Sequence, residues 1–489
     1  MPKTVAEKPQ SPDSGVDSDD LKRLGYAQTL RRSMGAFSSF ALAFSLISIN
    51  TGIFANFQTG IQQAGPAVVW SWLVVLAGQI LVALVLAELV THYPISGYGY
   101  QWTSRLVHPH YGFFVGWLLL LQFLTGFPGV CATFSDCVRI IWNPPVSGPV
   151  LTVIIIAAVT VIHLMGIRLA SLVNDAGVVA EIVGAAIIGT IFLIVLGPSS
   201  EHGLRILADT TNFQTHAPAG LSAFALSLLM GAWCLTGFEA SADLAEETHR
   251  PRRVIPRAML TSLLSSGLGG FLILVGFMLA IRDVQAVQSA PQPLLSIIEA
   301  KLGGRVTPIV MGVVLVSIFA CAVASMAATS RLIFSLARDN MLPFSRQLKA
   351  IQPKRRTPSS TIILIGVVSS AIVLGLEKLA LITSISATAG YLGYAGIIGA
   401  GLITRHKHDA PPDAFSMKAW STPVRVAALL WTILLVLALT IPDTGDGRMP
   451  VKATTIALAA GAVLYVVLVR GRILRGEAGP PTVDRDKTF

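Results

Sequence analysis

Long apolar stretches separated by short polar segments occupy most of the chain, from about residue 35 to about residue 470. About twelve of these stretches are long enough to cross a bilayer as a helix, which takes roughly 20 apolar residues. The pattern therefore predicts an all-α membrane protein with about twelve transmembrane helices.

Two of the apolar stretches are interrupted by polar residues and glycine. The first carries Ser48, Asn50, Thr51 and Gly52 at mid-membrane depth, and the second changes from apolar to polar over residues 236–241, TGFEAS. Freed backbone groups are tolerated at this depth only where they are buried in protein or line a cavity. We therefore expect unwound segments at about residues 48–53 and 236–240 that hold a small solute. For the first stretch, the alternative is a continuous helix whose hydroxyls bond back to its own carbonyls.

The order of the stretches predicts how the chain is organised. Each interrupted span is followed by four further spans, and an odd number of spans separates the two starts, so the two groups have opposite orientation. This is the plan of an inverted repeat. We expect a transporter domain over residues 35–470, made of repeats 35–197 and 220–404 and two appended helices within 424–470. Residues 1–34 are expected to form a disordered cytoplasmic tail, and residues 471–489 a second cytoplasmic tail.

Composition and charge support a membrane protein. Hydrophobic residues make up 53% of the chain and charged residues only 13%, whereas soluble domains carry about 25%. With the N-terminus inside, the cytoplasmic segments carry roughly 28 of the 36 Lys and Arg residues, as the positive-inside rule expects. The net charge of +10 is thus explained by topology and by contact with anionic membrane lipid, and no nucleic-acid partner is expected.

The sequence offers no chemistry typical of an enzyme. The four cysteines, Cys131, Cys137, Cys234 and Cys321, all lie in apolar spans, where cysteine acts as a small apolar packing residue. No metal-ligand cluster, nucleophile elbow or phosphate loop is found, so neither a metal nor a cofactor is expected.

Several motifs resemble those of the amino acid–polyamine–organocation transporters, and most closely the amino acid/choline branch that includes GABA permeases. The motifs are TGIF (Thr51–Phe54), AGP (Ala64–Pro66), AEL (Ala87–Leu89), YPISGYGYQW (Tyr93–Trp102), GFEASADLAEETHRPRRVIPRA (Gly237–Ala258) and SRLIFSLARDNMLP (Ser330–Pro343). The sequence departs from the family pattern at Tyr98 and Asn340, where glycine is usual.

The resemblance implies a LeuT-type fold of five plus five helices that works by alternating access in the plasma or inner membrane. The substrate would be an amino acid or a related amine, such as a GABA-like or choline-like molecule. The start of the second half of span one offers free N–H groups to a carboxylate, and the end of the first half of span six offers carbonyls to an ammonium group.

The substrate-binding candidates are the residues at and around the two interruptions, with one tyrosine of span ten. They are Ser48, Asn50, Thr51, Gly52, Ile53, Trp233, Thr236, Gly237, Phe238, Glu239 and Tyr391. For Glu239 the alternative is a helix cap, which favours an acidic residue without any substrate, and for Trp233 it is plain packing. Gln122 and Thr125 of span three are further cavity candidates.

Glu181 is an acidic residue in the otherwise apolar fifth span. Several relatives carry a lysine at the matching position, close to where a sodium ion lies in sodium-coupled members. We expect Glu181 to couple transport to a proton or sodium, with Ser325 and Thr329 nearby. The alternative is a carboxyl group that faces a polar neighbour, such as Asn174 or Thr190.

A cytoplasmic gate is expected at Glu246, Glu247 and Arg252, where acidic and basic residues cluster after the second interruption. A solvated loop is the alternative. For the whole chain, the leading hypothesis is a secondary active transporter, and the alternatives are a substrate exchanger of the same fold and, more remotely, a transporter-like sensor.

Overall fold

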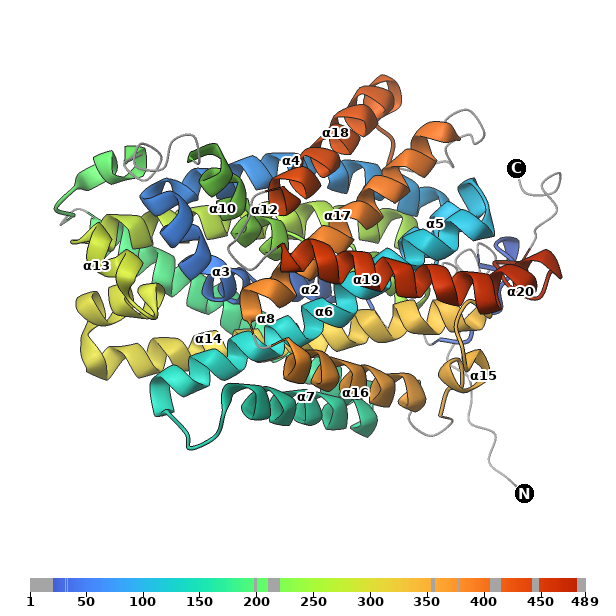
Figure 1. The fold of residues 1–489 in the computed structure, drawn as a ribbon, viewed down its shortest axis with the longest axis horizontal. Coiled ribbons are helices and arrows are strands. Elements are labelled where there is room, and N and C mark those ends of the chain that lie inside the picture. Colours follow the sequence, from blue (N-terminus) through green and yellow to red (C-terminus); the bar gives the residue numbers. More distant parts are fainter. Residues whose placement is uncertain are drawn as a thin grey trace.

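The computed structural model describes residues 21–30, 32, 34–197, 200–209, 220–352, 357–376, 378–404, 415–441 and 448–481. These residues are mostly helical, and many of the helices run roughly along the long axis of the molecule (Figure 1). An isolated parallel β-bridge joins Met34 to Thr248. The all-α class predicted from the hydrophobic pattern is confirmed. Residues 1–20 and 482–489 of the two expected tails lie outside the described residues.

The α-helices follow the apolar stretches closely. They are α2 (Ala36–Ile47), α3 (Ile49–Ala64), α4 (Val68–His92), α5 (Tyr98–Leu106), α6 (Pro109–Trp142), α7 (Gly148–Met165), α8 (Ile167–Thr190), α10 (Gly220–Cys234), α11 (Ala240–Asp243), α12 (Pro251–Ala280), α13 (Val284–Ser289), α14 (Pro293–Arg338), α15 (Ser345–Leu348), α16 (Ser359–Gly375), α17 (Leu379–Ile403), α18 (Ser421–Thr440), α19 (Met449–Leu464) and α20 (Arg470–Leu474). Proline stands in the first turn of α6, α7, α12, α14 and α19, where its missing N–H would have no helical partner anyway.

Nine helical segments of the described chain are long and apolar enough to cross a membrane. The first of them, Ala36–His92, contains α2, α3 and α4, which correspond to two predicted spans. The apolar helices α10 and α16 are shorter. The first segment counts as two spans, because Gly65–Ala67 separates α3 from α4, and α10 and α16 add one span each. The described chain then accounts for the twelve predicted spans.

The outer helices present apolar side chains to their surroundings. Val161, Ile187, Val367, Leu430 and Ile456, on α7, α8, α16, α18 and α19, are all at least 48% exposed. Monomeric soluble proteins rarely expose apolar surface on so many neighbouring elements. Together with the long apolar helical segments, these faces show that the protein is a multi-pass membrane protein.

The interior is built from the helices that carry the polar positions. The long helix α14 packs against α6 and α8, α17 packs against α6, and α3 packs against α10. The two interrupted spans are therefore in direct contact through α3 and α10. At the closest point Gly52 of α3 faces Cys234 of α10, and a Cβ atom at Gly52 would overlap the Cys234 side chain.

The short helices α5, α15 and α20 lie at one end of the bundle, and α13 lies at the other (Figure 1). We call the first of these the basic end, after Arg338, Arg346 and Arg472, which belong to it. Where the structure describes the expected N-terminal tail, the chain is packed rather than free: Leu21 and Tyr26 are buried at 2% and 8% exposure. The expectation of a disordered tail therefore does not hold for this segment, because its apolar residues find a buried place at the basic end.

Candidate functional site

A small cavity of ≈ 50 Å³ lies where the two interrupted spans meet. It is lined by Leu46, Ile47, Thr51, Gln122, Phe123, Gly126, Phe127, Val130, Trp233, Cys234, Thr236, Gly237, Cys321, Ser325 and Ser386. Its wall is apolar and aromatic on one part and carries hydroxyl, amide and thiol groups on another. A mostly apolar pocket with a few polar groups is typical of a small-molecule site.

The first interruption is confined to a single residue. Ser48 has φ 29° and ψ 96°, between the end of α2 at Ile47 and the start of α3 at Ile49. The N–H of Gly52 already donates to the Ser48 carbonyl at 3.0 Å. The expectation of an unwound stretch over residues 48–53 is therefore wrong beyond Ser48. The Ser48 hydroxyl accepts from the N–H of Thr51 at 3.3 Å, and this cap lets the helix restart at once.

The second interruption is longer and agrees with the prediction. Helix α10 ends at Cys234 and α11 begins at Ala240, so residues 235–239 are not helical. Gly237 lies at φ 96°, a conformation that glycine adopts without strain. A Cβ atom there would also press on the Leu46 side chain at 2.8 Å. The unwound segment thus lies directly against the end of α2.

The backbone carbonyls at the end of α2 face cysteine thiols. The Cys234 thiol lies 3.4 Å from the Ile47 carbonyl and 3.6 Å from that of Ser48, and the Cys321 thiol lies 3.6 Å from that of Leu46. Thiols are weak donors, so an ammonium group would be a stronger partner for the Leu46 and Ile47 oxygens; the Ser48 carbonyl already accepts from the N–H of Gly52. The end of α2 was not predicted as an acceptor, because nothing in the sequence shows which carbonyls the thiols face.

On α10 the predicted acceptors already have partners. The Trp233 carbonyl accepts from the Thr236 hydroxyl at 2.8 Å, and the Leu235 carbonyl accepts from Nε2 of Gln79 at 2.8 Å. The end of α2 therefore offers the less well satisfied carbonyls. A substrate ammonium group would lie closer to α2 than the sequence alone indicates.

Glu239 is fully buried and is held by donors from three segments. Tyr394 of α17 donates its hydroxyl to Oε1 at 2.7 Å, Gln122 of α6 donates Nε2 to Oε1 at 3.2 Å, and the N–H of Gly237 donates to Oε2 at 3.0 Å. Gln122 also lines the cavity. Glu239 does not line the cavity itself, but it connects the cavity wall to the second interruption and to α17.

The aromatic candidates lie behind the cavity. Tyr391 and Tyr394 are in edge contact, with ring centroids 5.7 Å apart, and Phe238 stacks on Tyr394 at 6.2 Å. All three side chains are fully buried, and none belongs to the cavity lining. Within the described part of the chain, the Tyr391 hydroxyl has no hydrogen-bond partner.

Glu181 of α8 points to the first interruption. Its carboxyl group is 1% exposed and faces the Ser48 hydroxyl, the N–H groups of Ile49 and Asn50, and the Ser317 hydroxyl. Among the described residues, Oε1 makes no hydrogen bond within 3.5 Å. Glu181 therefore lies beside the first interruption, and its neighbours are Ser48, Asn50 and Ser317.

The two hydroxyl residues predicted to assist Glu181 behave differently. Ser325 lines the cavity and lies beside Cys321. Thr329 donates its hydroxyl to the Ser325 carbonyl on the same helix at 2.6 Å. Thr329 is therefore satisfied within α14, while Ser325 faces the cavity.

Each of the two glutamates expected at the gate makes an ion pair with an arginine of α14. Glu246 binds Nη1 of Arg338 at 2.9 Å, and Glu247 binds Nε of Arg331 at 2.9 Å. The expected partner Arg252 has interactions of its own, but these two pairs go to Arg338 and Arg331 instead. The prediction of Arg252 as the partner was wrong, because α14 packs against this turn. Distance along the sequence does not reveal this packing.

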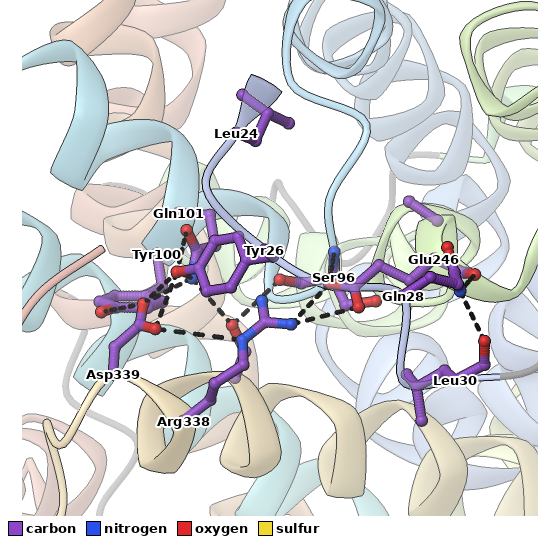
Figure 2. A network of polar contacts seen from close by, with 12 residues as sticks. Leu24, Tyr26, Gln28, Leu30, Ser96, Tyr100, Gln101, Glu246, Arg338 and Asp339 are labelled. Carbon is purple, nitrogen blue, oxygen red and sulfur yellow. Dashed lines mark hydrogen bonds and ion pairs between the residues drawn. The ribbon is translucent and has the colours of Figure 1, made fainter. Parts of the chain in front are cut away.

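The N-terminal segment covers the same end of the bundle (Figure 2). Tyr26 donates its hydroxyl to Asp339 at 2.8 Å, and Tyr100 and Gln101 of α5 donate to the same carboxylate at 2.8 and 2.7 Å. The Arg338 guanidinium lies 3.8 Å from the centre of the Tyr26 ring. Burial and the nearby Asp339 carboxylate raise the pKa of the Tyr26 phenol well above its ordinary value, so it remains a donor at physiological pH.

The structure separates the predicted substrate-binding residues into two sets. Thr51, Trp233, Thr236 and Gly237 line the cavity, as does the further candidate Gln122. The others lie outside its lining: Ser48, Asn50, Gly52, Ile53, Phe238, Glu239, Tyr391 and the further candidate Thr125. The sequence analysis missed Phe123, Phe127, Ser386 and the two cavity cysteines. Helical spacing from Gln122 predicts a shared face for Thr125 and Gly126 but not for Phe123 or Phe127, and Ser386 carries no local signal.

Comparison with known proteins identifies relatives along almost the entire chain. The sequence profile of a family described as amino acid permease matches residues 34–468. The chain is similar to the amino-acid permease BAT1 of Arabidopsis thaliana, with 26% identity over 92% of each chain. It is also similar to an uncharacterized amino-acid permease of Schizosaccharomyces pombe (23%; 95% of this chain and 87% of the relative) and to a putative polyamine transporter of Candida albicans (24%; 88% and 82%).

Proposed function

Because the chain belongs to the amino acid permease family, we propose that it is a secondary active transporter of a small amino acid or related amine. It works by alternating access and draws on a proton or sodium gradient. The observation that carries the proposal is the cavity between the two interrupted spans, which combines hydroxyl groups, weakly satisfied carbonyls and aromatic walls. The cavity is small, ≈ 50 Å³, which excludes bulky substrates in the described conformation.

The substrate is held by the ends of helices. Its ammonium group donates to the carbonyls of Leu46 and Ile47 in place of the Cys321 and Cys234 thiols. Its carboxylate lies toward the start of α3, where the helix dipole favours negative charge and Thr51 supplies a hydroxyl. Trp233 and Phe127 cover the carbon chain.

The basic end is the cytoplasmic side, and the protein lies in the plasma or inner membrane. The positive-inside rule supports this orientation. The buried pairs Glu246–Arg338 and Glu247–Arg331, together with Tyr26 on Asp339, close that side in the described conformation. The two groups of five spans, residues 35–197 and 220–404, move relative to each other when the closed side opens.

Glu181 couples the ion gradient to this movement. Its carboxyl group is buried at the first interruption, and its Oε1 has no partner among the described residues. A buried carboxyl group with an unpartnered oxygen can bind a proton, and with the Ser48 and Ser317 hydroxyl oxygens beside it, it can bind a sodium ion. Binding there alters the charge at the start of α3, next to the substrate.

The test is uptake by purified protein in liposomes. A panel of labelled amino acids, GABA, choline and polyamines is offered, with an imposed proton gradient, an imposed sodium gradient, or neither. The proposal expects at least one substrate to accumulate only when a gradient is imposed. Accumulation that instead needs a second substrate on the inside identifies an exchanger, and no flux of any panel member contradicts the proposal.

A further inference from the structure

Asp243 is a further buried carboxyl group, and neither the cavity nor the ion pairs use it. It ends the short helix α11 and is fully buried. In the described part of the chain, neither Oδ1 nor Oδ2 has a hydrogen-bond partner. A buried carboxylate without donors is unfavourable by several kcal/mol, and such groups take up a proton or bind a cation instead.

The groups that face Asp243 come from three directions. Glu239 precedes it by four residues, Arg331 of α14 acts on it electrostatically, and the N–H of Gly97 at the start of α5 faces it. Next to them lies Tyr98, whose hydroxyl is buried without a partner among the described residues. Asp243 thus lies between Glu239, which contacts the cavity wall through Gln122, and Arg331 of the closed gate.

The one cation among these neighbours is already engaged. Arg331 gives Nε and Nη2 to the Glu247 carboxylate at 2.9 and 3.4 Å, and Nη1 to the Ser330 hydroxyl at 3.1 Å. Glu239 has three donors, whereas Asp243 faces only the N–H of Gly97 and makes no hydrogen bond within 3.5 Å among the described residues. Two neighbouring carboxyl groups do not both ionise in a buried site, so the group with donors keeps the charge and Asp243 is neutral.

We propose that Asp243 binds a proton while the cytoplasmic side is closed and releases it when Arg331 exchanges Glu247 for Asp243. The O–H bond of the Asp243 carboxyl group breaks, the proton passes to cytoplasmic water, and the carboxylate pairs with Arg331. No other covalent bond changes. The link to opening of the gate rests on the proposed transport function, whereas protonation of Asp243 in the closed conformation does not.

Infrared difference spectroscopy of the purified protein at neutral pH tests the protonation. The carbonyl stretch of a protonated carboxyl group should be present in the parent and lost in Asp243→Asn. Asp243→Glu, which restores a carboxyl group, should regain a band and shows that the loss is not caused by misfolding. The matched control is Asp283→Asn, because Asp283 is an exposed cap of α13 that accepts from the N–H of Ala286; it should leave the band unchanged.

A separate variant tests the exchange of Glu247 for Asp243 as the partner of Arg331. Glu247→Gln releases Arg331, so the Asp243 band should disappear at neutral pH in this variant as well, and a band that persists contradicts the exchange. Equal spectra for the parent and Asp243→Asn overturn the whole proposal, as does a band that appears only when sodium and potassium are removed, since an alkali cation then occupies the site. These spectra need no substrate, so a failure of the liposome uptake assay leaves them interpretable.

Discussion

The hydroxyl of Tyr394 donates to Oε1 of the buried Glu239 at 2.7 Å and thereby joins α17 to the second interruption. Tyr394→Phe removes this donor without changing the shape of the ring. A hydrogen bond to a charged group contributes about 1.5–3 kcal/mol, so we expect kcat/KM for uptake to fall by about tenfold to a hundredfold. Initial uptake rates in liposomes measure the change.

Tyr391 provides the matched control for Tyr394. It lies on the same helix, is equally buried, and has a hydroxyl without a partner among the described residues. Tyr391→Phe should therefore alter uptake by less than about threefold, because the variant loses no hydrogen bond made by the described residues. Equal losses in the two variants would show that the hydrogen bond to Glu239 is not what matters.

Substitution of Gly52 tests how closely α3 packs against α10. A side chain at this position meets Cys234 of the facing helix α10. Gly52→Ala should lower the stability of the solubilised protein by about 1–3 kcal/mol, the usual range for overpacking, and the second change Cys234→Gly should restore much of it. Thermal unfolding of the single and double variants measures the rescue. Gly35→Ala is the control, since nothing lies within 4 Å of the added Cβ; a double variant no more stable than Gly52→Ala contradicts the packing account.

Removing one side chain of the buried ion pair between Glu247 and Arg331 should cause a large loss of stability. The two side chains are 8% and 4% exposed, and Glu247→Gln deprives Arg331 of this partner, which Asp243 can replace only after losing its proton. Removing one member of such a pair lowers stability by about 3–5 kcal/mol, which thermal unfolding reports as a reduced Tm. Arg282→Gln breaks the exposed pair with Glu201 and should have little effect. If both variants unfold at the parental temperature, the ion pairs do not hold the closed end together.

Glu181→Gln tests ion coupling, because it preserves size and removes the titrating group. Uptake against a concentration gradient should be lost, while exchange of labelled for unlabelled substrate across the liposome membrane should continue at a measurable rate. The pH and sodium dependence of uptake identify the ion, since only the dependence on the coupled ion should disappear. Parental accumulation with unchanged pH and sodium profiles would make Glu181 a structural residue.

The sequence predicts the fold well and the site only in part, and the reason differs between residues. Hydropathy is a property of each segment, so the spans and the polar interruption at Gly237 are visible without any partner. The break at Ser48 is displaced from Gly52 because glycine is tolerated inside a helix that packs closely, and Gly52 serves its contact with Cys234.

The sequence does not predict which distant segments contact each other. Glu246 and Glu247 lie close in sequence to Arg252, yet they pair with Arg338 and Arg331, 92 and 84 residues away. Ser386 of α17 reaches the cavity only because α17 packs on α6. The burial of Tyr26 on Asp339 depends on a segment whose polar composition resembles a free tail.

The central claim is that substrate occupies the cavity between the two interruptions, and its cysteines report on this directly. Cys234 and Cys321 line the cavity, whereas Cys137 is buried elsewhere in α6. Their rates of modification by methyl methanethiosulfonate, read peptide by peptide in a mass spectrometer, should fall about tenfold for Cys234 and Cys321 at a transported-substrate concentration of about ten times Kd, because the empty fraction falls by that factor. The Cys137 rate should not change. Unprotected Cys234 and Cys321 at saturating substrate would place the binding site elsewhere in the protein.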